Sequence, residues 1–243
     1  MTGIEFEREF DVLYNNITSN QAPELNAYEK SVFLTNAQNQ FVRQVFLPTT
    51  DQLKGGYDGS QERQYDLSSI TKVTSVAPTI ISASERTSFL SLDSIIYRCP
   101  EDAFLIINEE VRSMNNEQYQ VIPLHYDEYR RLSQKPYKYP VKNSAWRLFT
   151  KYEGVTYAEI IGRFKGEQVH YICRYVPTLI PIITSNLEDL MTGLTIDGYS
   201  QATECMLPEE CHREILDIAV IKAKQAWLAQ TALMDNQNRV RNE

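Results

Sequence analysis

Residue types that commonly carry out catalysis are sparse in this chain of 243 residues. The histidines are His125, His170 and His212, and His212 directly follows a potential nucleophile, Cys211. Successive residues on a helix point about 100° apart, so Cys211 and His212 are not expected to form a catalytic dyad. His170 alternates with Tyr171 in a strand-like run, where we expect a surface histidine or one that is hydrogen-bonded in the core.

Sequence motifs for phosphate, metal and ester chemistry are also absent. The chain has no Walker loop, GxSxG, HExxH or GxGxxG pattern, and neither Lys-Ser nor Lys-Thr follows Gly55-Gly56. Glu109 and Glu110 are neighbours in a predicted strand, so they point to opposite faces and cannot share a substrate. We expect both to be solvated, and the pair Glu209-Glu210 to mark the start of a helix. The sequence therefore predicts a protein that is not an enzyme and needs no cofactor or metal.

The bulk composition is that of a folded globular protein, with 42% hydrophobic and 23% charged residues. No run reaches the roughly 18 apolar residues of a membrane span, and the opening MTGIEFEREF is acidic where a signal peptide is basic. The cysteines, at positions 99, 173, 205 and 211, form no CxxC pair, so we expect reduced, buried thiols. A formal charge of -8 argues against general nucleic-acid binding, which depends on Lys and Arg.

One segment, residues 126–152, departs from this acidic background. It holds seven Lys and Arg side chains against Asp127 and Glu128, a local charge of +5; because the whole chain carries -8, the remainder carries -13. Aromatic residues are interleaved with these cations, and Pro136 and Pro140 stiffen the segment, which lowers the entropy lost on binding. We favour a docking surface for a neighbouring subunit or ring, since Tyr, Trp and Arg anchor protein interfaces. A solvated structural segment and a site for single-stranded nucleic acid are the alternatives.

Two amphipathic helices are predicted at the start of the chain. Thr2 and Glu5 have the spacing of a capping box, and an apolar stripe then runs to about residue 19. Asn26 and Glu29 repeat the cap before a second stripe that runs to Pro48. We expect a helical hairpin in which each stripe is buried against the other or against a third element, followed by a Gly-rich loop.

From about residue 70 the sequence is typical of β-structure, with runs of Thr, Val, Ile and Tyr cut by turn residues. Strands are predicted over 94–98, 103–112, 119–125, 146–152, 156–164, 167–176 and 179–184, and a short helix over 127–134. The second and third strands form one predicted hairpin, and Gly166 marks another between the strands on either side of it. About seven strands with such turns indicate an antiparallel β-sandwich or barrel.

A long helix is predicted to close the chain, from Pro208 to about Leu233. Its apolar residues cover more than one stripe, whereas a surface helix normally presents one apolar and one polar face. It is therefore either a central core helix or a helix shared between the core and a neighbouring subunit. The tail from Asp235 onward is polar, and we expect it to be disordered alone or ordered by a partner.

Several long phrases of the sequence match a known pattern in the same order. They are SIIYRCPEDAFLIINEEV, VIPLHYDEYRRLSQKPYKYPVKNSAWRLF, VHYICRYVPTLIPIIT and CMLPEECHREILDIAVIKAKQAWL. Together they resemble a virion ring protein of crAss-like phages of gut Bacteroidales. The opening helices, with YEKSVFLTNAQNQFV in the second, look like those of phage head-to-tail adaptor proteins. The resemblance spans nearly the whole chain.

The resemblance implies an α+β subunit with a helical adaptor core and an inserted antiparallel β-sandwich or barrel. Residues 1–69 and 186–243 would form the core, from the two N-terminal helices and the long C-terminal helix, and residues 70–185 would form the insertion. It also implies a homo-oligomer, a twelve-fold ring beneath a portal dodecamer that connects the portal to the tail and lines the genome channel. Genome DNA would only pass through, no membrane is involved, and the protein would belong to the neck or tail of a virion assembled in the host bacterial cytoplasm.

We expect the contacts with the portal protein and with adjacent tail or ring proteins to use cationic and aromatic side chains. The candidates are Arg130, Arg131, Tyr137, Lys138, Tyr139, Lys142, Trp146, Arg147, Trp227, Arg239 and Arg241. Two alternatives stay open. The chain is either a neck or tail-tube ring protein that does not touch the portal, or a nucleic-acid-binding accessory protein that uses residues 126–152.

Overall fold

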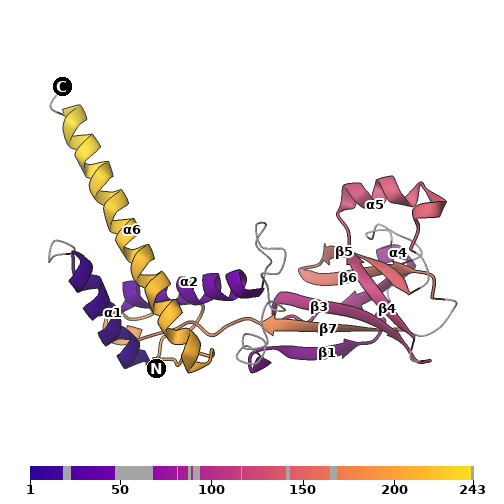
Figure 1. Cartoon of the computed structure of the whole chain (residues 1–243), viewed down its shortest axis with the longest axis horizontal. Helices are drawn as coiled ribbons and strands as arrows, with labels where there is room; N and C mark the ends of the chain where they lie inside the picture. The colour runs from indigo at the N-terminus through magenta and orange to yellow at the C-terminus, as the bar shows by residue number, and fades with distance from the viewer. Residues whose placement is uncertain are drawn as a thin grey trace. The chain divides into compact units, whose positions relative to one another are not determined.

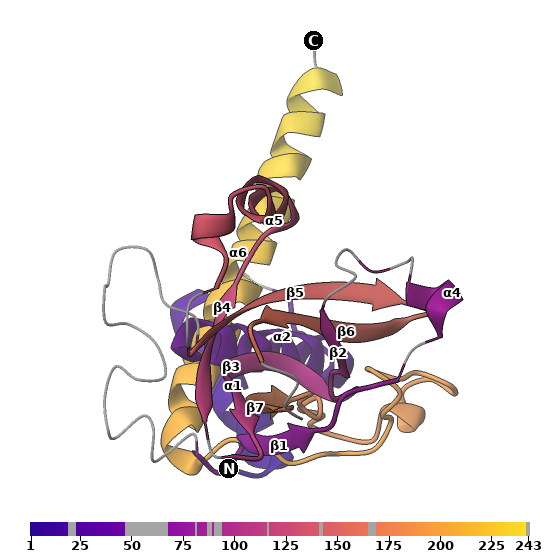
Figure 2. The ribbon, with the colours of Figure 1, turned by 90° about the vertical axis from the view of Figure 1, so that its right-hand side faces the viewer.

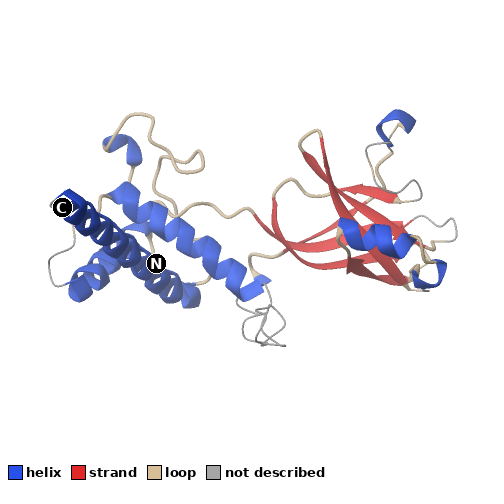
Figure 3. Cartoon of the chain, turned by 90° about the horizontal axis from the view of Figure 1, so that it is seen from above, coloured by secondary structure: helices blue, strands red, loops and turns tan. Residues whose placement is uncertain are grey.

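The computed structural model describes residues 1–18, 23–46, 68–80, 82–86, 89, 94–115, 117–140, 143–164 and 169–241. For residues 16–18, 46, 83–84, 136 and 230–241 it describes the backbone alone. The chain divides into two compact units: residues 1–70 with 179–243, which we call the helical unit, and residues 71–178, which we call the sheet unit. The named strands all lie in the sheet unit (Figure 3).

The two N-terminal helices are confirmed as α1 (Gly3–Thr18) and α2 (Ala27–Phe46), and each begins at the predicted capping box. The Thr2 amide donates to Glu5 Oε2 at 2.8 Å and the Glu5 amide donates back to Thr2 Oγ1 at 3.4 Å. Asn26 and Glu29 make the same exchange at 2.9 and 2.8 Å. The caps fix where both helices start, and therefore which face of each is apolar.

Both helices pack against α6 (Glu209–Arg241), which crosses them in the helical unit (Figure 1). The three helices contribute to the core of this unit apolar side chains that are at most 5% exposed, which are Phe6, Phe10, Tyr14, Leu34, Ala37, Phe41, Val42, Val45, Ile215, Leu216, Ala219, Val220 and Ala223. The backbone of α6 is helical to Arg241, beyond the expected end near Leu233, because no Gly or Pro interrupts it. The tail from Asp235, expected to be disordered alone or ordered by a partner, continues α6 as far as Arg241.

The predicted strand over residues 179–184 is wrong, because this segment carries no strand and belongs to the helical unit. Polar side chains on the buried face of α2 take the place of a neighbouring strand. The Ile182 amide donates to Thr35 Oγ1 at 3.1 Å, and Gln38 Nε2 donates to the Ile180 carbonyl at 3.0 Å. The backbone polar groups of the segment are thus satisfied by a helix instead of a β-ladder.

The sheet unit contains, in its described residues, one seven-stranded sheet with the order β1-β7-β3-β4-β5-β6-β2. The strands are β1 (Lys72–Val76), β2 (Ile95–Arg98), β3 (Ala103–Ser113), β4 (Gln118–Pro123), β5 (Ser144–Tyr152), β6 (Val155–Gly162) and β7 (Val169–Pro177), with the short helix α4 (Ala83–Arg86) between β1 and β2. The sheet is strongly curled (Figure 2), and the Thr79 amide beyond β1 donates to the Ile96 carbonyl on β2, the other edge strand, at 2.7 Å.

This architecture is α+β, as predicted, but in place of the predicted sandwich or barrel the insertion is one curled sheet that forms a half-barrel, and its ladder is not wholly antiparallel. β4 and β5 run parallel, because α5 (Tyr126–Ser133) and η2 (Pro136–Lys138) form a crossover between them. The predicted β3–β4 hairpin is confirmed. The predicted hairpin at Gly166 is wrong, since β6 pairs with β5 and β2 whereas β7 pairs with β1 and β3. Strand β1 was missed, and Gly166 itself lies outside the described residues.

Candidate interaction surfaces

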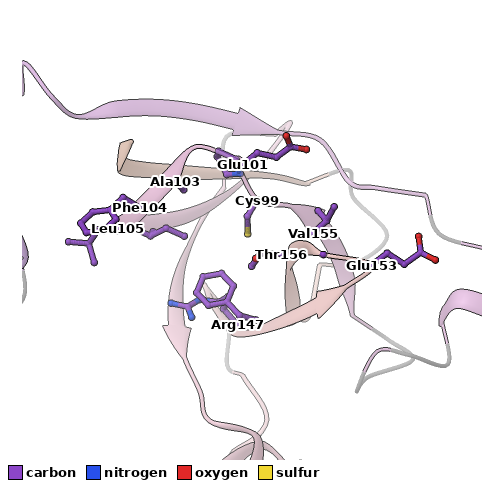
Figure 4. Close-up of a pocket in the computed structure, with 13 residues that line it drawn as sticks. Cys99, Glu101, Ala103, Phe104, Leu105, Arg147, Glu153, Val155 and Thr156 are labelled. Atoms are coloured by element: carbon purple, nitrogen blue, oxygen red, sulfur yellow. The ribbon is translucent and has the colours of Figure 1, made fainter. Parts of the chain in front are cut away.

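The sheet unit contains a cavity of about 690 Å³, which is the first place to look for chemistry. Figure 4 shows the Cys99 sulfur pointing into this space near Arg147, while the carboxylates of Glu101 and Glu153 point away from it. Burial raises the pKa of the Cys99 thiol to about 12, with smaller contributions from the nearby Cys173 and Glu109. A thiol that stays protonated at neutral pH is not a nucleophile, so Cys99 is a packing residue.

Arg147 also lines this cavity, but its guanidinium is already bound. Nε and Nη2 of Arg147 on β5 donate to Glu109 Oε2 on β3 at 3.1 and 2.5 Å, and the guanidinium carbon lies 3.8 Å from the ring centre of Phe149. The hydroxyl of Tyr171 on β7 donates to the other carboxylate oxygen of Glu109. The Glu109 side chain is only 9% exposed, so the expectation that it is solvated is wrong. Sequence reasoning missed this network because its members come from separate strands.

His212 is buried in the helical unit and both of its ring nitrogens are bound. The amino group of Met1 donates to Nδ1 at 2.8 Å, and Nε2 donates to the Leu207 carbonyl at 2.8 Å. Only the neutral tautomer with a proton on Nε2 satisfies both contacts, because an ammonium group donates and a carbonyl accepts. Within the described residues, no three His, Cys, Asp or Glu side chains gather closely enough to hold a metal ion.

The basic aromatic segment, residues 126–152, divides into an anchored and an exposed part. Trp146 is 4% exposed and packs with Leu148 and Ile161, and Tyr129 and Tyr139 cover it from α5 and from the end of η2. The ring centroids of Tyr139 and Trp146 lie 5.4 Å apart. Of the candidate contact residues, Trp146 and Arg147 are thus turned into the fold, and Tyr139 is half-buried against Trp146.

Four candidates of this segment lie at the surface, and we call them the basic surface: Arg130, Arg131, Tyr137 and Lys138. They are carried by α5 and η2, which cover one face of the sheet (Figure 1). Tyr137 is 77% exposed. Among the residues that the structure describes, none of these three cations takes part in an ion pair. Lys142 lies outside the described residues.

Helix α6 also carries large apolar side chains that are exposed. Ile221 and Leu228, two helical turns apart on one side, are 54% and 57% exposed, although the opposite side of the helix is buried in the core. Trp227 is half-buried at an apolar hollow of about 240 Å³. Its other apolar lining residues come from α1, the turn before α2, α2 and α6, and are Tyr14, Pro23, Leu25, Tyr28, Val32, Phe33, Ala223 and Ala226. The side chains of the remaining candidates, Arg239 and Arg241, are not described.

Comparison with known proteins identifies the class of protein that carries these surfaces. The family model described as phage tail ring protein 3/4 matches residues 1–235 of the chain. The chain belongs to this phage tail ring family. Ring protein 4/5 of Bacteroides phage crAss001 is 42% identical over 223 residues, which are 92% of each chain, and ring protein 3 of the same phage is 29% identical over 97% of this chain and 99% of its own length.

Membership of the tail ring family confirms the resemblance that the sequence phrases indicated, and makes the chain a structural virion protein of a tailed phage. The family's similarity extends through both units, since the matched residues run from α1 into α6. Across the part of the chain that the structure describes, no helix combines the length and apolar character that crossing a bilayer requires. Surfaces for assembly, and not a catalytic pocket, are therefore the features to explain.

Proposed function

We propose that this tail ring protein assembles into a closed twelve-fold ring that connects the portal to the tail and lines the genome channel. The observation that carries the proposal is the exposed apolar side of α6. Ile221 and Leu228 are 54% and 57% exposed, while the opposite side of the same helix fills the core of the helical unit. Large apolar side chains exposed on one side of a long helix are typical of a subunit contact, and we call Ile221 and Leu228 the α6 stripe.

A closed ring requires that each subunit present two different surfaces, one to each neighbour. The α6 stripe and the hollow beside Trp227 lie on the helical unit, and the basic surface lies on the sheet unit. Two distinct surfaces of this kind support head-to-tail contacts. Such contacts close into a ring when a whole number of rotations from one copy to the next makes a full turn. The ring therefore needs no catalytic group, and we propose that the protein is not an enzyme.

The net charge supports a role around a DNA channel. With -8 on each copy, a ring repels the phosphate backbone as a whole and does not trap the genome as it passes. The excess of Lys and Arg in residues 126–152 is then kept for protein contacts, where opposite charges set the register between partners. Strong single-strand binding by the purified protein would instead favour the nucleic-acid alternative.

We propose in addition that the end of the chain, from Asp235, docks on the portal. The backbone of α6 stays helical to Arg241, so the chain offers a continuous helical arm with Arg239 and Arg241 near its end. The numbered names of the two crAss001 relatives favour a second placement, because they indicate more than one kind of ring protein in that phage. In that placement the ring abuts another ring of the neck or tail tube and does not contact the portal.

The ring contact is tested by placing a charge on the α6 stripe. We expect Leu228→Asp to abolish rings that the wild type forms alone or on purified portal rings, as measured by native mass spectrometry. The control is Ile80→Asp, because Ile80 is 99% exposed and belongs to the sheet unit, whereas α6 belongs to the helical unit. Rings formed equally well by both variants would contradict the α6 contact.

The portal contact is tested separately by deleting residues 235–243. We expect the shortened protein to keep forming rings and to lose binding to purified portal rings. If it binds portal rings as tightly as the full chain, the terminal contact is wrong and the placement against another ring protein is favoured.

A further inference from the structure

The helical unit carries a loop that the ring contacts proposed above do not use. It spans residues 186–200, and we call it the acidic loop; it includes η3 (Leu187–Asp189). Leu187 is fully buried, and its amide donates to the Ser200 carbonyl at 2.8 Å, so the two ends of the loop are tied together. The loop is therefore anchored to the helical unit by a buried side chain, while most of its other residues are exposed.

The tip of the acidic loop is held by a tight turn. Ile196 and Tyr199 exchange two backbone hydrogen bonds of 2.9 Å, and the residues between them, Asp197 and Gly198, have φ of 49° and 86°. Positive φ at both central positions is the geometry for which Asp-Gly is favoured, so the sequence itself specifies this turn. A loop that is ordered before it binds loses little entropy on binding.

The exposed side chains of the acidic loop combine apolar area with negative charge. Leu190, Met191 and Tyr199 are 51%, 67% and 44% exposed. Glu188 and Asp189 are exposed beside them, and the chain has no Lys or Arg between Arg174 and Arg213. Large apolar side chains that the fold leaves in water, bordered by carboxylates, are typical of a contact surface.

The basic surface on the sheet unit has the complementary chemistry. Arg130, Arg131 and Lys138 supply the opposite charge, and Tyr137 and Tyr126, at 77% and 48% exposed, supply aromatic area for apolar side chains. Among the described residues, the carboxylates of Glu188 and Asp189 take part in no ion pair, as is true of the three cations. Glu188 Oε1 accepts a hydrogen bond from Ser200 Oγ within the loop at 3.2 Å, and the carboxylates and cations of both surfaces are exposed to an intermolecular contact.

We propose that the acidic loop of one copy docks on the basic surface of the next copy. This inference rests on the proposed ring, and it names the acidic loop as the partner of the basic surface within that ring. Because both surfaces belong to every chain, the contact repeats head to tail around the ring. Charge complementarity fixes its register, and the apolar tip of the loop packs against the tyrosines.

Two charge-reversed variants test the contact. The first, Arg130→Glu with Lys138→Glu, makes the basic surface acidic; the second, Glu188→Lys with Asp189→Lys, makes the acidic loop basic. For each variant alone, we expect the fraction of chains found in rings to be about tenfold lower than for the wild type, because close like charges repel at an interface. The matched controls are Arg8→Glu with Arg174→Glu and Glu24→Lys with Glu204→Lys, which reverse exposed charges outside both surfaces and should assemble normally.

Mixing the two variants in equal amounts is the decisive step. In a ring of alternating copies, each acidic loop meets a basic surface and each basic loop meets an acidic surface, so mixing should restore rings that contain both proteins. Native mass spectrometry at physiological salt separates such mixed rings from rings of one variant by the mass difference. Circular dichroism of each variant checks that the fold is intact.

Three results would overturn the proposal. Both variants could assemble as well as the wild type; mixing could fail to restore rings; or rescue could occur only when all four changes are made in one chain, which would mean a contact within the chain. Failure of the wild type to form rings, alone or on portal rings, would instead overturn the proposed function, so the two failures are distinguishable.

Discussion

Arg147 on β5 reaches across β4 to form an ion pair with Glu109 on β3, with 2.5 Å between Nη2 and Oε2. The two side chains are only 14% and 9% exposed. Because Tyr171 on β7 donates to the same carboxylate, the contacts of Glu109 span the consecutive strands β7, β3, β4 and β5, including the parallel pair. This network therefore links the strands of the curled sheet that lie under α5 and η2, the crossover that carries the basic surface.

Removing the cation of this network should lower the stability of the folded protein. We expect Arg147→Met to lower the free energy of unfolding by about 3 kcal/mol, because it leaves a largely buried carboxylate without its partner. Urea denaturation measures the loss. The control is Lys72→Met, which removes the exposed Lys72–Asp102 ion pair and should cost less than about 1 kcal/mol. Equal, small losses for the two variants would show that the Glu109 network does not stabilise the sheet.

The row of polar side chains on the buried face of α2 gives a second prediction. Thr35→Val keeps the shape of the side chain but removes the oxygen that accepts the Ile182 amide, so the free energy of unfolding should fall by about 1 to 3 kcal/mol. Gln44→Ala, an exposed change on the same helix, should stay within about 0.5 kcal/mol of the wild type. If Thr35→Val is as harmless as Gln44→Ala, the segment 179–184 does not depend on α2 for its hydrogen bonds.

Stability should depend on pH through His212. Burial lowers the pKa of His212 below its ordinary value of 6.5 and outweighs the hydrogen bond to the Leu207 carbonyl, which raises it; the adjacent amino group of Met1 lowers the pKa further, and Glu209 and Glu210 raise it slightly. Below pH 6.5 the unfolded chain therefore binds a proton that the folded chain resists, so the free energy of unfolding falls as the pH falls from 6.5 towards the folded pKa.

Unfolding curves measured from pH 7.5 downward should show this loss for the wild type. His212→Gln should flatten the dependence in that range, whereas the control His125→Gln, at an exposed position, should keep it. A slope that survives His212→Gln unchanged would assign the effect to another group.

Thiol reactivity provides a prediction for the sheet core. Burial raises the pKa of Cys99 to about 12 and that of Cys173 to about 11. Because the thiolate is the reactive form, neither should be alkylated by iodoacetamide at pH 8 in the folded protein, and both should react once the chain is unfolded in urea. Mass spectrometry of the alkylated peptides gives the result directly. Fast labelling of Cys99 in the native protein would mean that the cavity opens widely to solvent.

Local features of this fold were predictable from the sequence because they depend on nearby residues. The capping boxes at Thr2 and Asn26 and the apolar stripes behind them specify α1 and α2. Alternating apolar residues specify most strands, and the turn after Ser113 specifies the β3–β4 hairpin. Each of these signals lies within a short window of the chain, so no knowledge of distant partners is needed.

Pairing between distant segments was not predictable in the same way. The sequence 179–184 has strand-like composition, but its hydrogen-bonding partner turned out to be the side-chain row on α2. The parallel pairing of β4 with β5 depends on where α5 packs, which the local pattern does not contain. Likewise Trp146 and Arg147 stand in a segment rich in Lys and Arg, and as neighbours in β5 they point to opposite faces of the sheet. Both are buried because Tyr129 and Tyr139 cover Trp146, whereas Glu109 binds Arg147 on the other face.

Native mass spectrometry of the full-length protein, alone and on purified portal rings, tests the central claim most directly. We expect a discrete assembly of twelve chains, and we expect Leu228→Asp to eliminate it while Ile80→Asp leaves it intact. A protein that stays monomeric under both conditions, or that forms a ring whose stability does not change with Leu228→Asp, would contradict the proposed ring built on α6.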